Sequence, residues 1–342
     1  MTYRADARLS APQAKRRSTP LPGLALSAAG AAAAIGLGQL LPAVSPLLIA
    51  IALGAVLSNL ARVPAATGPG VAVASRSLLR VGIALLGLNL VLGDILGLGW
   101  RVIVVVVVVV ALGVAGTLYA GHALGIGWRQ RVLIACGFSI CGAAAVAAVD
   151  GVVEADEDEV STAVALVVIF GTLMIPAAPL VAHALGLSEE AAGIWAGASV
   201  HEVAQVVAAG GALGGTALGV AVVVKLARVL TLAPVVAAVS LRQRRIAAET
   251  GTRRPPLVPL FIVGFLTCVA ARSTGLVGPG ALEVAGGAQT GLLAAAMFAL
   301  GTGVRVASLR RVGAKPFLLA AVATVWVAGI ALVGVLWAGA EG

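Results

Sequence analysis

The sequence is short of charge and of aromatic residues. Of its 342 residues, 11% are Asp, Glu, Lys or Arg and 4% are aromatic, whereas 60% are hydrophobic. A soluble domain carries about a quarter charged residues, so this chain has too little polar surface to cover a globule in water. The mean hydropathy of +1.08 supports the same conclusion. The composition excludes an ordinary soluble protein and indicates a polytopic, all-α membrane protein in a lipid bilayer.

Cysteine is also scarce, and this excludes several kinds of site. The three cysteines, Cys136, Cys141 and Cys268, all lie in apolar stretches. They match neither a disulfide framework nor a zinc-binding pattern, so we expect them to pack as small apolar residues. The sequence also carries no nucleophile–base set. We therefore expect no metal, no cofactor and no enzymatic activity.

Long apolar runs are what the sequence has in abundance. A membrane-spanning helix needs about 20 mainly apolar residues, and eleven segments meet this requirement. The first follows a basic tail, residues 1–21, and is too long for the apolar part of a signal peptide, so we expect it to be retained. The predicted spans are 22–42, 44–61, 81–99, 102–121, 132–149, 160–185, 191–210, 214–240, 257–275, 288–306 and 317–338.

The positive charges predict an orientation. If the spans alternate from a cytoplasmic N-terminus, 19 of the 23 Lys and Arg residues fall on the cytoplasmic side and the C-terminus lies outside. Membrane proteins concentrate Lys and Arg in their cytoplasmic loops. This asymmetry predicts a bacterial inner-membrane protein and accounts for the net charge of +9 without nucleic acid.

An acidic run interrupts the chain between the fifth and sixth spans. It comprises Asp150, Glu154, Asp156, Glu157, Asp158 and Glu159. With eleven spans it falls outside, where we expect a solvated loop, because such blocks are usually solvated. A cation site is the alternative. The loop between the sixth and seventh spans is predicted to be cytoplasmic but holds no Lys or Arg, only His183, Glu189 and Glu190 among its ionisable residues.

An odd number of spans predicts an internal repeat. We expect one extra helix (22–42) followed by two five-helix repeats, 44–185 and 191–338. Because five is odd, the second repeat must be inverted relative to the first, a recurring plan of secondary transporters. In such transporters, discontinuous helices occupy corresponding positions in the two halves. The domain organisation predicted here is thus a single transmembrane transporter domain, 22–342.

The fourth helix of each predicted repeat carries two glycines and a hydroxyl near its middle. In the fifth span these lie between Gly137 and Gly142, and in the tenth between Gly301 and Gly303. Glycine weakens a helix interior by about 1 kcal/mol, so both sites are predicted breaks. Five residues there are candidates for substrate binding: Ser139, Cys141, Gly142, Thr302 and Gly303. The alternative is close helix packing through small residues.

Two clusters of polar residues lie within predicted spans. In the seventh span Ser199, Glu202 and Gln205 recur every three residues, which predicts a polar stripe on one helix face. His201 and Glu202 are suited to bind and release protons in a buried site. We therefore predict proton coupling by His201, Glu202 and Gln205. The alternative is hydrogen bonding between helices. A metalloprotease would need His-Glu-x-x-His, but Gln205 stands in the fifth position.

Lys225 and Arg228 form the second cluster, in the eighth span. Charges inside a bilayer cost about 2.5–3.5 kcal/mol each on an insertion scale, so they are candidates for function. The two cations could bind an anionic substrate, for which Arg offers a planar fork, or neutralise Glu202. Lys225 could instead extend to the membrane interface.

Four segments carry a family resemblance. They are residues 137–146 (GFSICGAAAV), 199–210 (SVHEVAQVVAAG), 225–235 (KLARVLTLAPV) and 313–316 (GAKP). In this order they resemble the YeiH-type bacterial membrane proteins, a family named for sulfate export. The resemblance implies an anion exporter. It also implies a fold like that of sodium/proton antiporters and bile-acid symporters, an inverted repeat with crossed broken helices.

These observations together predict a secondary transporter of a small anion, such as sulfate or a sulfonate, coupled to protons. The alternatives are a monovalent cation/proton antiporter that uses Glu202, and a membrane component that does not transport. The sequence leaves open whether the protein forms a homo-oligomer.

Overall fold

The structure is a computed structural model that describes residues 19–41, 44–61, 63–250, 258–304 and 313–339. Helices and short connections make up this part of the chain, which contains no strand, so the predicted all-α class is confirmed. Within the described ranges, seven helical stretches are long and apolar enough to cross a membrane; two of them, Ala65–Asn89 and Gly215–Ile246, join shorter elements. The third predicted span, 81–99, is therefore displaced: the stretch there begins at Ala65 and ends at Asn89. Most of the predicted basic tail, residues 1–18, lies outside the described residues.

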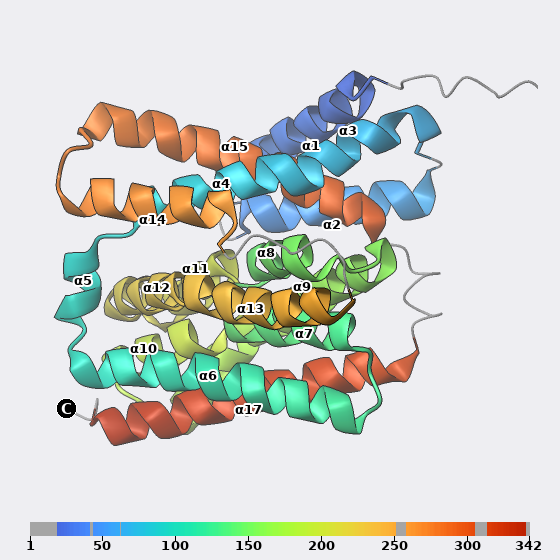
Figure 1. The fold of residues 1–342 in the computed structure, drawn as a ribbon. Helices are drawn as coiled ribbons and strands as arrows, with labels where there is room; N and C mark the ends of the chain where they lie inside the picture. Colours follow the sequence, from blue (N-terminus) through green and yellow to red (C-terminus); the bar gives the residue numbers. More distant parts are fainter. Residues whose placement is uncertain (1–18, 42–43, 62, 251–257, 305–312, 340–342) are drawn as a thin grey trace, which may run out of the picture.

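The helices follow one another as in Figure 1. Their bounds are α1 Leu21–Leu40, α2 Pro46–Leu60, η1 Ala65–Thr67, α3 Gly68–Val73, η2 Ala74–Leu78, α4 Leu79–Leu86, η3 Gly87–Asn89, α5 Leu92–Gly97, α6 Trp100–Ala123, α7 Trp128–Ser139, α8 Ala143–Val153, α9 Glu157–Ala184, α10 Glu189–Ser199, α11 Val203–Leu213, α12 Gly215–Leu230, α13 Leu232–Thr250, α14 Leu260–Ser273, α15 Pro279–Gly303 and α17 Ala314–Ala338.

The helices gather into two bundles (Figure 1). We call α1 to α4, α14 and α15 the companion bundle; in it α15 packs against α1, α2 and α4. We call α6 to α13 and α17 the hairpin bundle; in it α6 packs against α17, and α12 packs against α10 and α11. The short helix α5 joins the two bundles. The interface between them includes α9 against α15 and α8 against α4.

The fifth predicted span is a hairpin and does not cross the molecule. The break predicted there is confirmed, because α7 ends at Ser139 and α8 begins at Ala143. The chain then turns back. A Cβ atom added to Gly137 of α7 would lie 2.8 Å from Cγ2 of Val146 of α8. The far ends of α7 and α8 therefore lie at the same end of the molecule, where α6 ends and α9 begins (Figure 1).

The seventh predicted span is a second hairpin, formed by α10 and α11. Helix α10 ends at Ser199, and α11 begins at Val203 after an extended turn. A Cβ atom on Gly214, just after α11, would lie 2.8 Å from Cδ of Glu189, the first residue of α10. The two hairpins enter the bundle from opposite ends (Figure 1). Irregular backbone at this depth is tolerated in a membrane where protein surrounds it.

The hairpins change which charges share an end of the molecule. Gly151 of α8 lies against the Arg80 guanidinium, because a Cβ atom there would be 2.6 Å from Nη2. The prediction that the acidic run and Arg80 lie at opposite ends is therefore wrong. Glu190 lines one pocket with Arg101 of the first turn of α6, at the opposite end of α6 from Arg129, which is also contrary to prediction. We call the end where α6 ends and α7 begins the basic end; the described Lys and Arg residues near it are Arg129, Arg131, Arg242, Arg244, Arg245 and Lys315. Arg76 and Arg80 lie farther inward, along the helical stretch Ala65–Asn89.

The glycines predicted to break the tenth span near its middle lie instead at the end of helix α15. The helix runs without interruption from Pro279 to Gly303, and residues 305–312 lie outside the described part of the chain. Its glycine at position 301 serves close packing, the alternative considered above: a Cβ atom on Gly301 would lie 3.1 Å from the backbone nitrogen of Ala55 in α2. Small residues let helix backbones approach closely in lipid. The first hairpin is thus the fourth predicted span of the first repeat, whereas the second hairpin is the first predicted span of the second repeat. The two hairpins therefore do not occupy corresponding positions in the predicted repeats.

Candidate functional site

The tips of the two hairpins meet inside the hairpin bundle. Each tip follows a Gly-x-Ser sequence, residues 137–139 at the end of α7 and 197–199 at the end of α10. The helix that follows both hairpins, α12, brings Lys225 and Arg228 to them. Both side chains are fully buried. Most of the residues predicted for the site from distant parts of the sequence therefore do come together.

Lys225 joins the two tips. Its Nζ donates hydrogen bonds to the carbonyl oxygen of Ile140 in the first tip (2.9 Å) and of Val200 in the second (2.8 Å). These carbonyls lie just past the C-terminal ends of α7 and α10, where helix dipoles concentrate negative partial charge. A cation placed there satisfies carbonyls that the breaks leave without helical partners.

Arg228 binds the same two helix ends. Its Nε donates to the carbonyl oxygen of Ser139 (3.3 Å), and Nη2 donates to that of Phe138 (3.2 Å). On the second hairpin, Nη1 donates to the carbonyl oxygens of Gly197 (3.1 Å) and Val200 (3.0 Å). In this structure both cations are engaged by backbone carbonyls. Their contacts do not present them to an anion, the role for which the sequence made them candidates.

Glu202 binds the opposite kind of helix end. Its side chain accepts a hydrogen bond from the backbone N–H of Gln205, and the Gln205 side chain accepts one from the N–H of Glu202, which makes a capping box at the start of α11. The Glu202 Oε1 also accepts from the N–H of Ala143, the first residue of α8, at 3.0 Å. One carboxylate thus holds the N-termini of both hairpin helices, where the dipole favours negative charge.

The capping box explains why the predicted polar stripe does not exist. Ser199 ends α10 and Glu202 caps α11, so these two residues and Gln205 do not lie on one face of a continuous helix. The pattern of Glu202 followed three residues later by Gln205 resembles the sequence signature of a capping box. That signature normally begins with Ser or Thr, which is why the sequence alone indicated a stripe and not a helix start.

His201 lies between the first tip and α17. Its Nδ1 is 3.2 Å from the carbonyl oxygen of Phe138, and its Nε2 is 3.1 Å from Oγ1 of Thr324. A carbonyl only accepts hydrogen bonds, so Nδ1 carries a proton. His201 is fully buried and packs against the Phe138 ring, with ring centroids 4.5 Å apart. It is close to Glu202 in sequence, but its ring faces other partners.

Three polar atoms near the tips have no hydrogen-bond partner among the described residues. They are Oγ of Ser139, Oγ of Ser199 and Nε2 of Gln205, and all three residues are fully buried. Buried polar groups are nearly always paired, so unpaired ones mark a position where a partner could bind. Cys141 and Gly142 complete the first tip. Gly142 has a φ of 78° and lies against the Glu202 side chain.

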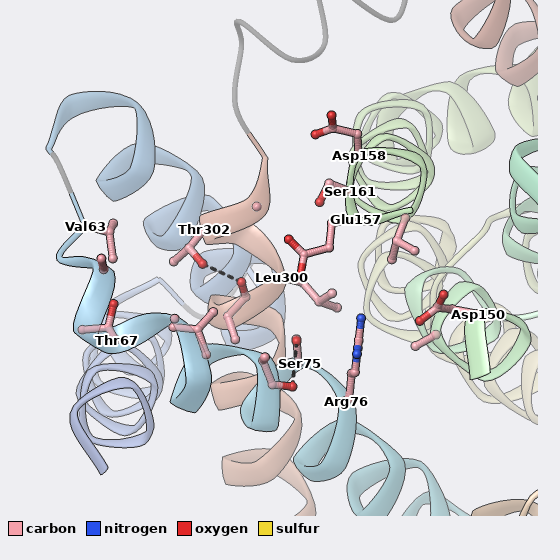
Figure 2. A pocket seen from close by; sticks show the side chains of 18 of the residues that line it. Val63, Thr67, Ser75, Arg76, Asp150, Glu157, Asp158, Ser161, Leu300 and Thr302 are labelled. Atoms are coloured by element: carbon pink, nitrogen blue, oxygen red, sulfur yellow. Dashed lines mark hydrogen bonds between the residues drawn. The ribbon is translucent and has the colours of Figure 1, made fainter. Parts of the chain in front are cut away.

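Thr302 and Gly303 are not at the hairpin tips. They line a cavity of about 490 Å³ between the two bundles (Figure 2). On the companion side Arg76 points into this cavity, and Asp150, Glu157 and Asp158 face it from α8 and α9. The sequence did not predict this meeting of charges, since it placed Arg76 and the carboxylates at opposite ends.

The cavity extends along the interface between the bundles. Its lining includes the exposed Glu157, in the first turn of α9, and Arg76, midway along the stretch Ala65–Asn89. Ala147 of α8 also lines it. That residue lies four positions after Ala143, which is about 6 Å along the helix. The cavity therefore reaches to about one helical turn from the N–H that Glu202 binds.

Comparisons with known proteins agree on one family. The family described as conserved hypothetical protein 698 matches residues 22–320. A UPF0324 membrane protein of Corynebacterium glutamicum is 55% identical over 316 residues, which is 92% of each chain. The UPF0324 inner membrane protein YeiH of Salmonella typhi is 38% identical over 319 residues, 90% of each chain. A UPF0324 membrane protein of Bacteroides thetaiotaomicron is 33% identical over 290 residues. No solved structure matches the chain.

Proposed function

Since the chain belongs to this UPF0324 family of membrane proteins, we propose that it is a secondary transporter of a small anion in the bacterial inner membrane. The observation that carries the proposal is the meeting of two opposed hairpins at a buried polar cluster. Broken helices of this kind build substrate sites near the middle of the bilayer in secondary transporters. Ionisable residues at that depth are functional candidates by default.

The two bundles offer a physical basis for alternating access. The cavity between them extends along their interface toward the first hairpin tip. In the transport cycle the hairpin bundle would move against the companion bundle, closing this route and opening one at the other end. The positive-inside rule favours a cytoplasmic basic end. With that assignment α1 begins inside and α17 ends outside, which is consistent with the orientation predicted from the sequence.

An anion suits the electrostatics of the tips. The N-termini of α8 and α11 provide backbone N–H groups and positive partial charge, a combination that binds anions. The tips also hold two basic side chains, Lys225 and Arg228, but one carboxylate, Glu202. Sulfate or a sulfonate fits this excess of positive charge. The buried Glu202 also favours a second candidate, a monovalent cation/proton antiporter, although Lys225 and Arg228 would repel the cation.

Flux in proteoliposomes tests the proposal. The purified protein is reconstituted, and uptake of labelled sulfate and isethionate is measured with and without a pH gradient. We expect uptake above that of empty liposomes, with the gradient increasing it. A parallel measurement of Na⁺- or K⁺-driven proton movement addresses the antiporter. Anion flux with no cation response supports the proposal, whereas cation-driven proton movement without anion flux favours the antiporter.

A further inference from the structure

The carboxylate of Glu202 occupies the place where an anion would bind to the hairpin tips. We propose that Glu202 and the transported anion take turns at the N-termini of α8 and α11, so that the anion binds only when Glu202 is protonated. Proton and anion then cross together as a symport. This inference rests on the proposed anion transport. It adds that the proton moves in the same direction as the anion, and that one proton moves with each anion.

The contacts of Glu202 define the shared site. Its carboxylate accepts from the N–H of Ala143 at 3.0 Å and from the N–H of Gln205. These groups belong to the first turns of two helices of 11 residues each. An incoming carboxylate, sulfonate or sulfate would use the same donors, because such helix ends bind oxyanions. Glu202 and the anion therefore compete for one pair of N–H groups.

A second observation points to a ligand at this place. The Gln205 side chain lies in the first turn of α11, fully buried, and its Nε2 has no partner among the described residues. It is a hydrogen-bond donor, and donors are what an anion requires. Gly142 leaves the space that the carboxylate fills, since a Cβ atom there would lie 2.8 Å from the Glu202 Oε1. Gly142 thus lets the carboxylate reach the N–H group of Ala143.

The charges around Glu202 make the exchange depend on a proton. Lys225 and Arg228 approach from α12, Cys141 from the first tip, and His201 precedes Glu202 in the second. From α9, the uncharged Gly171 packs against Gln205. The basic groups are held by carbonyls and stay in place. An ionised Glu202 and a second anion at the same N–H groups would repel each other, so one must lose its charge.

The proton balance is simple. One proton adds to a Glu202 carboxylate oxygen when the anion binds from one side, and it leaves when the anion is released on the other. By linkage, anion affinity should fall about tenfold for each unit of pH above the range in which Glu202 binds its proton. A Gln at this position, neutral at every pH, should abolish that dependence.

Calorimetry on the purified, full-length protein tests the inference. Sulfate and isethionate are titrated between pH 5.5 and 8.5 in two buffers of different ionisation enthalpy, which gives the protons taken up per anion. We expect about one proton per anion at the alkaline end in the natural protein. Glu202→Gln should take up none and should bind at pH 8.5 as tightly as the natural protein binds at pH 5.5. Glu283→Gln, an exposed acid in α15, is the matched control.

Each outcome decides between the two proposals. Anion binding by the natural protein without proton uptake overturns the exchange and leaves anion transport standing. Proton uptake that persists in Glu202→Gln also overturns it, because another group then carries the proton. If neither protein binds either anion at any pH, both proposals fail. The two-buffer measurement on the natural protein tests the exchange even where a variant does not fold.

Discussion

The side chain of Glu189, the first residue of α10, lies against Gly214, the residue that follows α11. A Cβ atom on Gly214 would be 2.8 Å from Cδ of Glu189. Two 11-residue helices placed end to end would separate these positions by about 33 Å. The contact is therefore direct evidence that α10 and α11 form a hairpin, and it fixes which loops share an end of the molecule.

Labelling of single cysteines should reveal the hairpins. With Cys136, Cys141 and Cys268 replaced by Ala, a cysteine is introduced at Asp158, Arg244 or Glu190 and treated with a membrane-impermeant maleimide in sealed vesicles of each orientation. We expect Asp158→Cys and Arg244→Cys to react from the same side and Glu190→Cys from the other. Asp158 and Arg244 lie at the basic end, and Glu190 lies beside Arg101.

Eleven crossing helices give a different pattern. They place Asp158 outside, and they place both Arg244 and Glu190 on the cytoplasmic side. Reaction of Asp158→Cys from the side opposite to Arg244→Cys would therefore contradict the hairpin of α7 and α8.

Replacing Lys225 should destabilise the fold and not only weaken transport. Lys225→Met leaves the carbonyl of Ile140 without its buried donor, whereas the carbonyl of Val200 keeps Arg228 as a donor. An unsatisfied buried group costs about 1–3 kcal/mol. We expect a lower melting temperature in detergent, measured without any substrate. Lys225→Arg, which keeps the charge and the donors, is the control. A Lys225→Met protein as stable as the natural one would instead point to a role in binding the substrate.

Gly142 should tolerate no side chain. Its φ is 78°, and a Cβ atom would overlap the Glu202 side chain. The ψ of Gly142 is −138°, and such a backbone conformation is rarely adopted by residues with a side chain. Gly142→Ala should therefore lower stability by about 1–3 kcal/mol for the strained backbone, plus about 1–3 kcal/mol for overpacking. Gly186→Ala is a comparison for a positive φ without a contact, because Gly186 has a φ of 63° but nothing within 4 Å. A fall in melting temperature no larger for Gly142→Ala than for Gly186→Ala would contradict the prediction.

Two glycines of α15 should respond in opposite directions. Gly301→Ala would place a methyl group against the carbonyl oxygen of Ile51 in α2, and we expect destabilisation of about 1–3 kcal/mol. Gly287→Ala meets nothing within 4 Å and should be neutral or stabilise by up to about 1 kcal/mol, the helix propensity gained. Melting of the two proteins in the same detergent checks this. A loss at both positions would mean that α15 requires flexibility at its glycines.

The predicted orientation of the two ends of the chain stayed internally consistent, although two predicted spans, 132–149 and 191–210, do not cross the molecule. These two segments each turn back. Because two crossings are absent, every helix after the second hairpin keeps the direction that was predicted for it. Only the stretch between them is affected. That stretch holds the acidic run and the loop with Glu189 and Glu190, and this loop is where the predicted charges departed from the positive-inside pattern. With two hairpins, Glu189 and Glu190 leave the basic end and the anomaly disappears.

The candidate site could be predicted in part. Buried ionisable residues are costly, so Lys225, Arg228, His201 and Glu202 stood out by type alone, and the structure gathers them at the two tips. Their roles could not be read from type. A lysine that binds a substrate and one that binds two backbone carbonyls look alike in sequence. Thr302 was selected because the glycines on either side of it, Gly301 and Gly303, predicted a helix break. Glycine also permits close helix packing, and Gly301 packs closely against α2.

The sequence by itself determined the environment of this protein, its all-helical class, the break after Ser139 and most of the residues at the hairpin tips. These follow from hydropathy, from charge and from local backbone preferences, each carried by a few consecutive residues. Tertiary structure alone decided that the broken segments fold back and that Glu202 binds the N-termini of α8 and α11. It also decided that Lys225 and Arg228 bind the C-terminal ends of α7 and α10. An 11-residue apolar helix has the same local energetics whether the next helix continues or reverses, so the direction is set by distant partners, here the side chains of α12 and the glycine surfaces that pack against it.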